Sequence, residues 1–283
     1  MFQQLRTLFP MTIFRVSCPH AGHLSLFALC LLSVLPAWSA QAGKELVADA
    51  CYNERYQLEH ETLWSSEIQR RTGGHVYLEK QVETLDGPVR RLIAIDGNEP
   101  SPAERTRDDD RLRNLLQNPK AGLQLKKDRE ADLVKVSDLL RVIPEAFLFE
   151  DQGNQGNIEK LAFRPNPAYK PKSYEERVLH AMSGIILVDV EEKRLAQISA
   201  TLIEPVDFGY GVLGRLKQGG SVSMTRVRLS PGIWKTSSYR IDINGRLIFF
   251  KTIGKQQDEI RSDFKPVGSN TSIAEALQQL GSK

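Results

Sequence analysis

The sequence predicts a mainly β protein in which a large curved antiparallel sheet, open as a half-barrel, is covered by helices. About ten or eleven short β-rich runs follow one another between turns that contain Gly, Pro or Asn. The connections between these runs are too short for parallel crossovers, so neighbouring strands are expected to be antiparallel. A single long segment, residues 101–143, has helical periodicity, and we expect it to cover or plug the concave side of the sheet.

The N-terminal segment, residues 1–42, has the pattern of an export signal. Arg6 and Arg15 precede an apolar run from Leu24 to Leu35, and a small-x-small cleavage site ends at Ala42, directly before Gly43. We therefore expect cleavage between Ala42 and Gly43 and a mature protein in the periplasm or cell envelope.

The alternative for the same segment is an uncleaved anchor in the inner membrane. The stretch Leu24–Ala40 has 17 residues and includes Pro36. A membrane-spanning helix needs about 20 predominantly apolar residues, so cleavage is the favoured interpretation.

The composition of the mature chain excludes several classes of function. Removal of residues 1–42 takes away two arginines and no acidic residue, which leaves 36 basic and 35 acidic residues. Such a balance argues against nucleic-acid binding. Only Cys51 remains of the three cysteines, so the mature chain cannot form an internal disulfide. We expect no cofactor and no nucleotide.

The first strands of the mature chain are expected to form an antiparallel meander. They are Trp64–Thr72, His75–Leu85 and Pro88–Ile95, separated by Gly73-Gly74 and Asp86-Gly87. Asp-Gly between β-rich runs is a strong hairpin signal.

Residues 101–143 are predicted to form two helices. Ser101 is followed by Pro102 and, three positions after the serine, by Glu104, which together make a capping box with proline at the first helical position. Asn118-Pro119 interrupts the apolar stripe, and Pro144 follows the second helix.

After the helices the strand pattern resumes and continues to about Phe264. Ile185–Val188 is apolar at every position, which indicates a strand covered on both faces. Residues 43–267 are therefore interpreted as one domain, followed by a polar tail, 268–283, with a short helix. The expected strands are Phe147–Glu150, Ile158–Arg164, Val178–Val190, Arg194–Ile203, Phe208–Leu216, Ser221–Leu229, Trp234–Ile243 and Leu247–Ile253.

Part of this pattern resembles the periplasmic lipoprotein-carrier and outer-membrane lipoprotein-sorting (LolA/LolB-like) superfamily. The resemblance is carried by the hairpin Gly184–Asp189 with Arg194–Ala200 and by the later strands from Phe208–Leu216 onward. Two further segments, Arg70–Tyr77 and Phe249–Ile253, are similar to uncharacterised exported bacterial proteins of comparable length. The resemblance implies an open half-barrel whose apolar interior holds acyl chains, and it assigns no role to any individual residue.

Several motifs that suggest other chemistry have simpler explanations. Gly209–Gly214 matches G-x-G-x-x-G, but no helix has room to follow it, so glycines at a curved strand explain it better. Asp151–Ile158 has the outline of a calcium loop without its carboxylate ligands and is expected to be a hairpin turn. Asp108–Asp110 is either a cation clamp or a solvated helix face.

The remaining polar residues predict no catalytic or metal site. His60, His75 and His180 share no metal-ligand spacing, and no hydrolase signature is present. His75 and His180 are expected to lie in strands. The sequence therefore favours a protein that is not an enzyme, although a dispersed catalytic triad stays open.

Aromatic side chains in the predicted strands are the remaining candidates for a site. Either they fill a core between sheet and helices, or some of them line an apolar pocket for a lipid or lipoprotein acyl chain. The alternative function is a structural or interaction module that contacts another envelope protein. The candidates for ligand binding are Trp64, Phe149, Phe163, Trp234 and Phe250.

Overall fold

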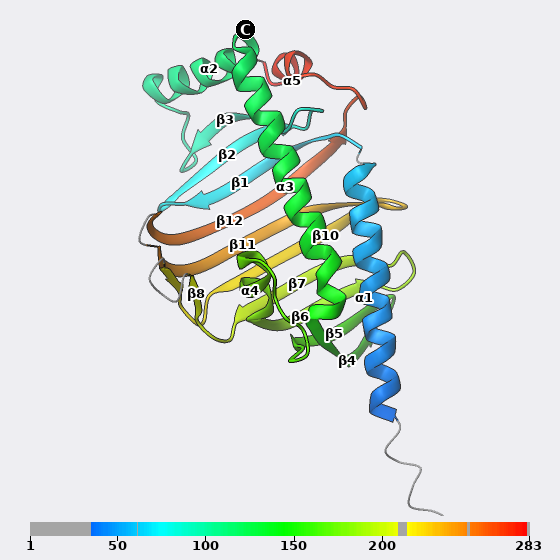
Figure 1. Cartoon of the computed structure of the whole chain (residues 1–283). Helices are drawn as coiled ribbons and strands as arrows, with labels where there is room; N and C mark the ends of the chain where they lie inside the picture. Colours follow the sequence, from blue (N-terminus) through cyan, green and yellow to red (C-terminus); the bar gives the residue numbers. More distant parts are fainter. Residues whose placement is uncertain (1–34, 61, 209–213, 248–249, 282–283) are drawn as a thin grey trace, which may run out of the picture. The chain divides into compact units, whose positions relative to one another are not determined.

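Twelve strands make up much of the chain that the computed structural model describes, which comprises residues 35–60, 62–208, 214–247 and 250–281 (Figure 1). Residues 1–34, with most of the predicted signal core, lie outside the described residues. The strands are β1 (Trp64–Thr72), β2 (His75–Val82), β3 (Val89–Ile95), β4 (Phe147–Gln155), β5 (Ile158–Pro165), β6 (Met182–Asp189), β7 (Arg194–Leu202), β8 (Val206–Phe208), β9 (Gly214–Leu216), β10 (Ser221–Ser230), β11 (Ile233–Leu247) and β12 (Phe250–Pro266).

These strands form one antiparallel sheet that does not close into a barrel. Its order is β3-β2-β1-β12-β11-β10-β7-β6-β5-β4, and the short β8 and β9 attach beside β11. The expected meander of β1, β2 and β3 is present. A second antiparallel run from β4 to β12 returns the last strand to a place beside β1. The predicted fold class, a large open antiparallel sheet with helices, is confirmed.

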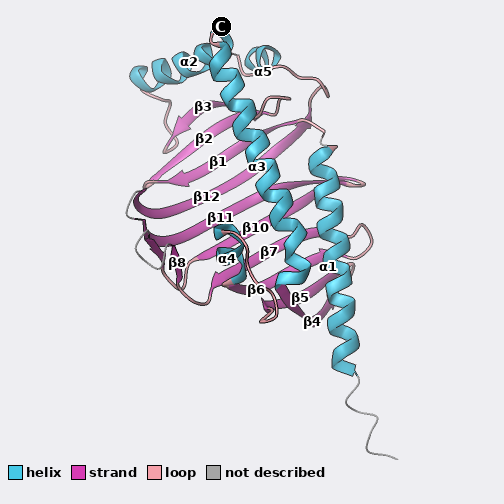
Figure 2. Cartoon of the chain, in the orientation of Figure 1, coloured by secondary structure: helices cyan, strands magenta, loops and turns pink. Residues whose placement is uncertain are grey.

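In the described part of the chain, five helices accompany the sheet. They are α1 (Leu35–Glu59), α2 (Pro102–Gln117), α3 (Pro119–Ala146), α4 (Tyr174–His180) and α5 (Ile273–Gln279). Figures 1 and 2 show α1 and α3 crossing the same face of the sheet, with α2 and α5 near the β3 edge. Among the described residues, no helix combines the length and the apolar character that crossing a membrane requires.

The β3 edge of the sheet is partly covered by α2. Asp108 accepts a hydrogen bond from the backbone N–H of Leu92 at 3.1 Å, and Arg111 donates to the backbone carbonyl of Arg90. An uncovered edge strand presents unpaired backbone groups, so these contacts protect part of the edge.

The prediction for residues 101–143 is confirmed at its start and wrong at its end. Ser101 and Glu104 form the expected capping box, and Asn118 separates α2 from α3. However, α3 continues through Pro144 to Ala146. Both of these residues are buried, so tertiary packing holds the last turn in place although proline removes one hydrogen bond from it.

Several strand boundaries also differ from the prediction. β4 continues to Gln155 and β12 to Pro266, and the short β8 and β9 lie at the two ends of the predicted strand Phe208–Leu216. The predicted strand Val178–Val190 begins only at Met182, because residues 174–180 form α4, which Ser173 caps by accepting the backbone N–H of Glu176 at 3.1 Å. Asn244-Gly245 is not a turn but part of β11, and a register shift after Gly245 accommodates it. Sequence shows which residues favour a turn, whereas the neighbouring strand decides whether the turn forms.

The described side chains form two core clusters. The larger joins α1 to strands β4–β7, through Val47, Ala50 and Cys51 on the helix and aromatic and aliphatic side chains on the sheet. The smaller lies near the β3 edge, where Val82 and Val89 pack against α2 and α5. The predicted C-terminal helix thus packs its buried Ala276 and Leu277 into this cluster.

Candidate functional site

The helix-covered face of the sheet has an apolar half and a polar half. Antiparallel partners that lie directly opposite each other share a face, so the cross-strand register traces one row across the sheet. Leu161, at one end of the row, belongs to the apolar core. It packs closely against α1 at Gly43, because a Cβ added to this glycine would lie 3.1 Å from Cδ2 of Leu161. The row then passes through Ile186, Ile198, Met224, Tyr239 and Glu259 to Arg70.

The apolar half contains two of the predicted ligand-binding residues. Phe149 and Phe163 lie opposite each other on β4 and β5, and both are buried in the larger core cluster. The rings of Phe163 and Phe147 meet edge to face with centroids 4.9 Å apart. Both residues therefore belong to the core that includes α1, and they also line a cavity of about 300 Å³ on β4 and β5.

The other three predicted residues lie apart from this pair. Trp64 begins β1, and its indole N–H donates to Thr62 at 2.9 Å. Trp234 is buried on β11, and its indole N–H donates to Glu192 at 2.6 Å. The side chain of Phe250 lies outside the described residues. The structure therefore brings Phe149 and Phe163 together and places Trp64 and Trp234 elsewhere on the sheet.

A buried ionic contact fastens α1 to the middle of the sheet. Glu54 accepts hydrogen bonds from Nε and Nη2 of Arg194 at 2.9 and 3.0 Å and from the backbone N–H of Leu195 at 3.1 Å. It also forms an ion pair with Arg226. The three charged side chains are less than a tenth exposed, so their mutual contacts replace the hydration that each of them has lost.

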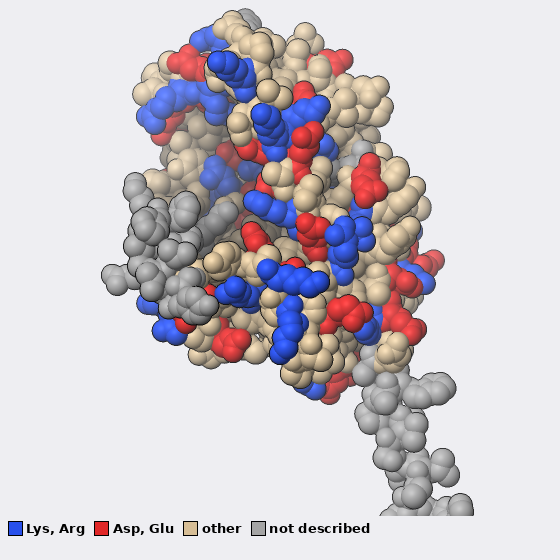
Figure 3. Space-filling model, viewed as in Figure 1, with Lys and Arg blue, Asp and Glu red and all other residues tan. Residues whose placement is uncertain are grey.

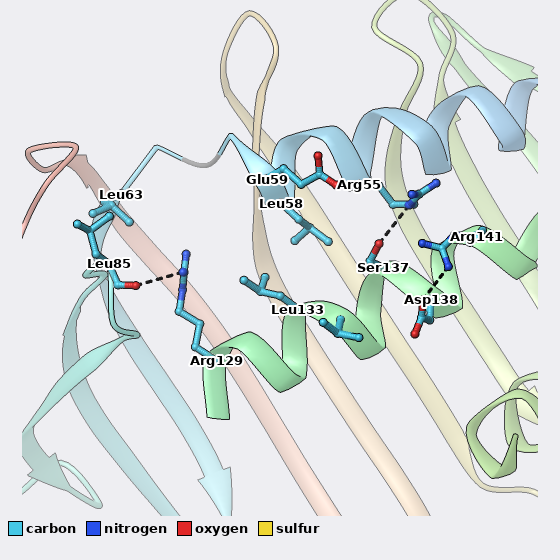
Figure 4. A pocket seen from close by; sticks show the side chains of 11 residues that line it. Arg55, Leu58, Glu59, Leu63, Leu85, Arg129, Leu133, Ser137, Asp138 and Arg141 are labelled. Atoms are coloured by element: carbon cyan, nitrogen blue, oxygen red, sulfur yellow. Dashed lines mark hydrogen bonds and ion pairs between the residues drawn. The ribbon is translucent and has the colours of Figure 1, made fainter. Parts of the chain in front are cut away.

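A cavity with a mixed apolar and charged lining lies between α1, α3 and the chain at Leu63 and Leu85, next to β1 and β2. Its volume is about 530 Å³. Figure 4 shows Leu58 of α1 and Leu133 of α3 pointing toward each other across it. The full lining consists of the apolar Leu58, Leu63, Leu85, Leu133 and Val134, the basic Arg55, Arg129 and Arg141, and Glu59, Ser137 and Asp138. We call it the α1–α3 cavity.

Polar contacts join the walls of the α1–α3 cavity. Arg55 Nε donates to the Ser137 hydroxyl at 3.2 Å, which links α1 to α3. Arg129 donates to the backbone carbonyl of Leu85 at 3.2 Å, and Arg141 pairs with Asp138 at 2.8 Å (Figure 4). Three arginines face two carboxylates here, so the cavity combines an apolar floor with a slight excess of positive charge.

The polar half of the sheet carries a second group of charges, which we call the arginine cluster: Arg70, Arg90 and Arg261 with Glu79 and Glu259. Glu259 is almost fully buried. Burial opposes its ionisation, but the neighbouring Arg261 and Arg90 hold the pKa of Glu259 below its ordinary value. The carboxylate is therefore charged near neutral pH and orders the guanidinium groups around it.

Cys51 is a core residue of α1 with no disulfide partner. Burial raises the pKa of its thiol to about 12, and Glu54 adds to the increase. We predict that Cys51 in the folded protein does not react with a thiol reagent such as DTNB near pH 8, where an ordinary thiol with a pKa of about 8.5 is partly ionised. The thiol should react within the mixing time in denaturant. Rapid labelling without denaturant would contradict the burial of this face of α1.

The other motifs singled out in the sequence have structural roles where they are described. Asp151–Ile158 forms the β4–β5 hairpin, in which Gln155 pairs with Ile158 and Gly156 adopts a φ of 60°. Of the G-x-G-x-x-G motif, residues 209–213 lie outside the described residues and Gly214 begins β9. No group of three or more His, Cys, Asp or Glu side chains in the described chain is arranged to hold a metal ion.

The acidic run on α2 and the histidines have partners of ordinary kinds. Asp108, Asp109 and Asp110 pair with Arg111, Arg91 and Arg113, respectively. His75 lies at the start of β2 as predicted and pairs with Asp96 at 2.7 Å, whereas the prediction of a strand for His180 is wrong, because it ends α4. His60 and His180 contact backbone carbonyls of Tyr56 and Asn166.

Sequence reasoning did not find the α1–α3 cavity or the arginine cluster. The stretch that becomes α1 after Gly43 carried no recognised helix signal, and Leu133 was visible only as part of an apolar stripe. Charged residues occur at adjacent positions of β1 and β12, as in Arg70-Arg71 and Asp258-Glu259, so the sequence did not show which sheet face carries the arginine cluster.

No protein-family model matches the sequence, and no curated protein has a significant match to it. A solved structure of a DUF1329 family protein from Desulfovibrio piger ATCC 29098 aligns with 86% of this chain and 99% of its own length, with 12% sequence identity and a TM-score of 0.27. A likeness at this level does not assign the chain to a family.

Proposed function

We propose that the protein is exported to the cell envelope and there binds, without catalysing a reaction, a ligand that has an apolar chain and an anionic head group. The observation that carries this proposal is the α1–α3 cavity, with its leucine lining and its three arginines. Its volume of about 530 Å³ lies within the usual range of small-ligand sites, roughly 300–1,000 Å³.

The chemistry of the lining favours such an amphiphile over a purely apolar ligand. Burial of an alkyl chain against Leu58, Leu63 and Leu133 is favourable by about 25 cal/mol per Å² of surface removed from water. A guanidinium group matches carboxylate and phosphate oxygens in geometry and charge. A fatty acid or the acyl end of a lipid or lipoprotein satisfies both requirements.

The position of the predicted cleavage site is compatible with export. Ala42 is exposed and Gly43 is the first buried residue of the described part of α1. The core contacts of Val47, Ala50 and Cys51 and the ionic contact of Glu54 all follow it. A chain that begins at Gly43 retains all of these contacts, so removal of the signal does not require the helix to be rebuilt.

We predict that Leu133→Trp weakens ligand binding about tenfold or more, which corresponds to about 1.4 kcal/mol or more, because the indole occupies the cavity. The probe is cis-parinaric acid, whose fluorescence rises in an apolar site, added to residues 43–283. The matched control is Val136→Trp on the same helix, an exposed position that does not line the cavity. It should bind as the unaltered protein does.

Native mass spectrometry of residues 43–283, purified from periplasm without detergent, provides the complementary measurement. An additional mass that lipid extraction resolves into acyl species supports the proposal. Absence of probe binding, or equal weakening by the two tryptophan variants, would contradict it. A fatty alcohol of matched length that binds as tightly as the acid would remove the argument for an anionic head group.

A second function is favoured by the exposed apolar side chains of α3. Leu123 and Val134 are each about half exposed and lie eleven positions apart, which places them on the same face of α3. A helix face of this kind is suited to contact with another envelope protein. Cross-linking in envelope extract distinguishes the two functions, because a partner captured through this face of α3 should be lost with Leu123→Asp while binding of cis-parinaric acid remains, since Leu123 does not line the α1–α3 cavity.

A further inference from the structure

The arginine cluster is more than a set of matched ion pairs. Arg70 donates to Glu79 through Nε and Nη2 at 3.3 and 2.8 Å. Arg261 pairs with Glu259 through Nη2 at 2.6 Å, and Arg90 lies between the two glutamates, 3.4 Å from Glu259 and 3.6 Å from Glu79. The three guanidinium groups are therefore balanced by only two carboxylates, which leaves the cluster with a net positive charge.

Each of the three guanidinium groups has donors left over. All three guanidinium nitrogens of an arginine carry N–H donors. The glutamates and Gln81, which accepts from Arg90 Nε at 2.8 Å, occupy two nitrogens of each group. In the described part of the chain, no hydrogen bond is made by Nη1 of Arg70, Nη2 of Arg90 or Nη1 of Arg261.

These donors are held in place and can be reached from solvent. The side chains of Arg70, Arg90 and Arg261 are 24%, 29% and 27% exposed. Tyr77 supports Arg70 from one side, with its ring centroid 4.8 Å from the guanidinium carbon. Figure 3 shows charged side chains of both signs set back between the projecting helices on this face. Partial burial reduces screening by salt and strengthens attraction for an anion.

We propose that the arginine cluster binds an oxyanion, a phosphate or carboxylate group of a polar ligand, on the concave side of the sheet. The excess positive charge and the three guanidinium nitrogens that make no hydrogen bond to a described residue provide the recognition, since arginine binds such groups through paired N–H donors. Glu79 and Glu259 orient the arginines. None of these residues lines the α1–α3 cavity, so this site does not depend on the proposed function.

Arginine footprinting with phenylglyoxal and mass spectrometry tests the proposal on the unaltered protein. Inorganic phosphate should slow modification of Arg70, Arg90 and Arg261 at least severalfold relative to chloride at matched ionic strength. Arg240 is the internal control, because it pairs with Asp258 on the opposite face of neighbouring strands and should be modified equally in both salts. Equal modification of the cluster in both salts, or equal protection of Arg240, would overturn the proposal.

A substitution measures the contribution of the cluster to affinity. Arg261→Gln should weaken binding of inorganic phosphate about tenfold or more in calorimetric titration, while Arg240→Gln should leave it unchanged. Arg261→Gln could fail to fold because Glu259 has lost one of its arginines. In that case the phenylglyoxal footprint of the unaltered protein decides whether the cluster binds phosphate. Vesicles identify the source of the group: protection by phosphatidylglycerol but not phosphatidylcholine vesicles indicates a lipid head group, and protection by inorganic phosphate alone indicates a soluble ligand.

Discussion

Glu54→Gln is expected to destabilise the protein by about 3–5 kcal/mol, the usual cost of removing one partner from a buried ion pair. The substitution keeps the shape of the side chain and removes its charge. It leaves Arg194 and Arg226, whose side chains are 6% and 9% exposed, without the carboxylate that both of them contact. Urea unfolding, monitored by circular dichroism, measures the loss. The urea concentration at the midpoint should fall, while the dependence of the unfolding free energy on urea concentration should stay unchanged.

The matched control for this experiment is Glu45→Gln on the same helix. Glu45 is exposed, and its side chain accepts a hydrogen bond from Gln41. A surface substitution of this kind is expected to change stability by no more than about 0.5 kcal/mol. Equal effects of the two variants would mean that α1 is not fastened to the sheet by Glu54.

A local measurement distinguishes release of α1 from general loss of stability. Cys51 lies almost one turn before Glu54 and is covered by the sheet in the folded protein. In Glu54→Gln we expect faster labelling of Cys51 by DTNB without denaturant, because detachment of α1 exposes the thiol while the sheet remains folded. The same helix forms a wall of the α1–α3 cavity, so its detachment would also open the proposed ligand site.

Gly184→Ala is expected to be comparably destabilising, by about 3 kcal/mol or more, because the added methyl group meets backbone. Gly184 lies on β6 opposite Ala200 of β7. A Cβ at this position would be 1.9 Å from the carbonyl oxygen of Ser199 and 2.9 Å from Cα of Ala200. No side-chain rotation relieves these contacts, so β6 and β7 would have to separate or change register.

Gly122→Ala is the control with the opposite expected sign. Gly122 lies in α3, and an added Cβ would have an ordinary contact of 3.5 Å with the Ile273 side chain. Replacement of a helical glycine by alanine stabilises by about 0.5–1 kcal/mol when space is available. Unfolding midpoints of the two variants should therefore move in opposite directions. An unchanged midpoint for Gly184→Ala would contradict the close approach of β6 and β7.

The local features of the fold were accessible from the sequence. The capping box at Ser101, the break at Asn118 and the first hairpins are specified by residues a few positions apart. Such signals report turns and helix ends because backbone hydrogen bonding and steric limits act over short stretches of chain. The antiparallel arrangement followed from short connections alone. In contrast, the strand signal at residues 178–180 was wrong because a serine cap favoured a helix there.

The candidate sites depend on contacts between residues that are distant in the sequence. Glu54 meets Arg194 and Arg226 only when α1 lies across the sheet, and Arg90 of β3 meets Glu259 of β12 only because the sheet order is β3-β2-β1-β12. A charged residue in a strand has the same local sequence whether it faces solvent, a core or a ligand.

The sequence by itself determined the fold class, the order of most elements and the pattern of an export signal, because each of these follows from composition, periodicity and turn chemistry along the chain. Only the tertiary structure decided that aromatic residues such as Phe149 and Phe163 fill a core, that leucines from α1 and α3 line a cavity, and that three arginines gather around two glutamates. The physical reason is that burial and electrostatic neighbours are set by which strands pair and which helix covers them.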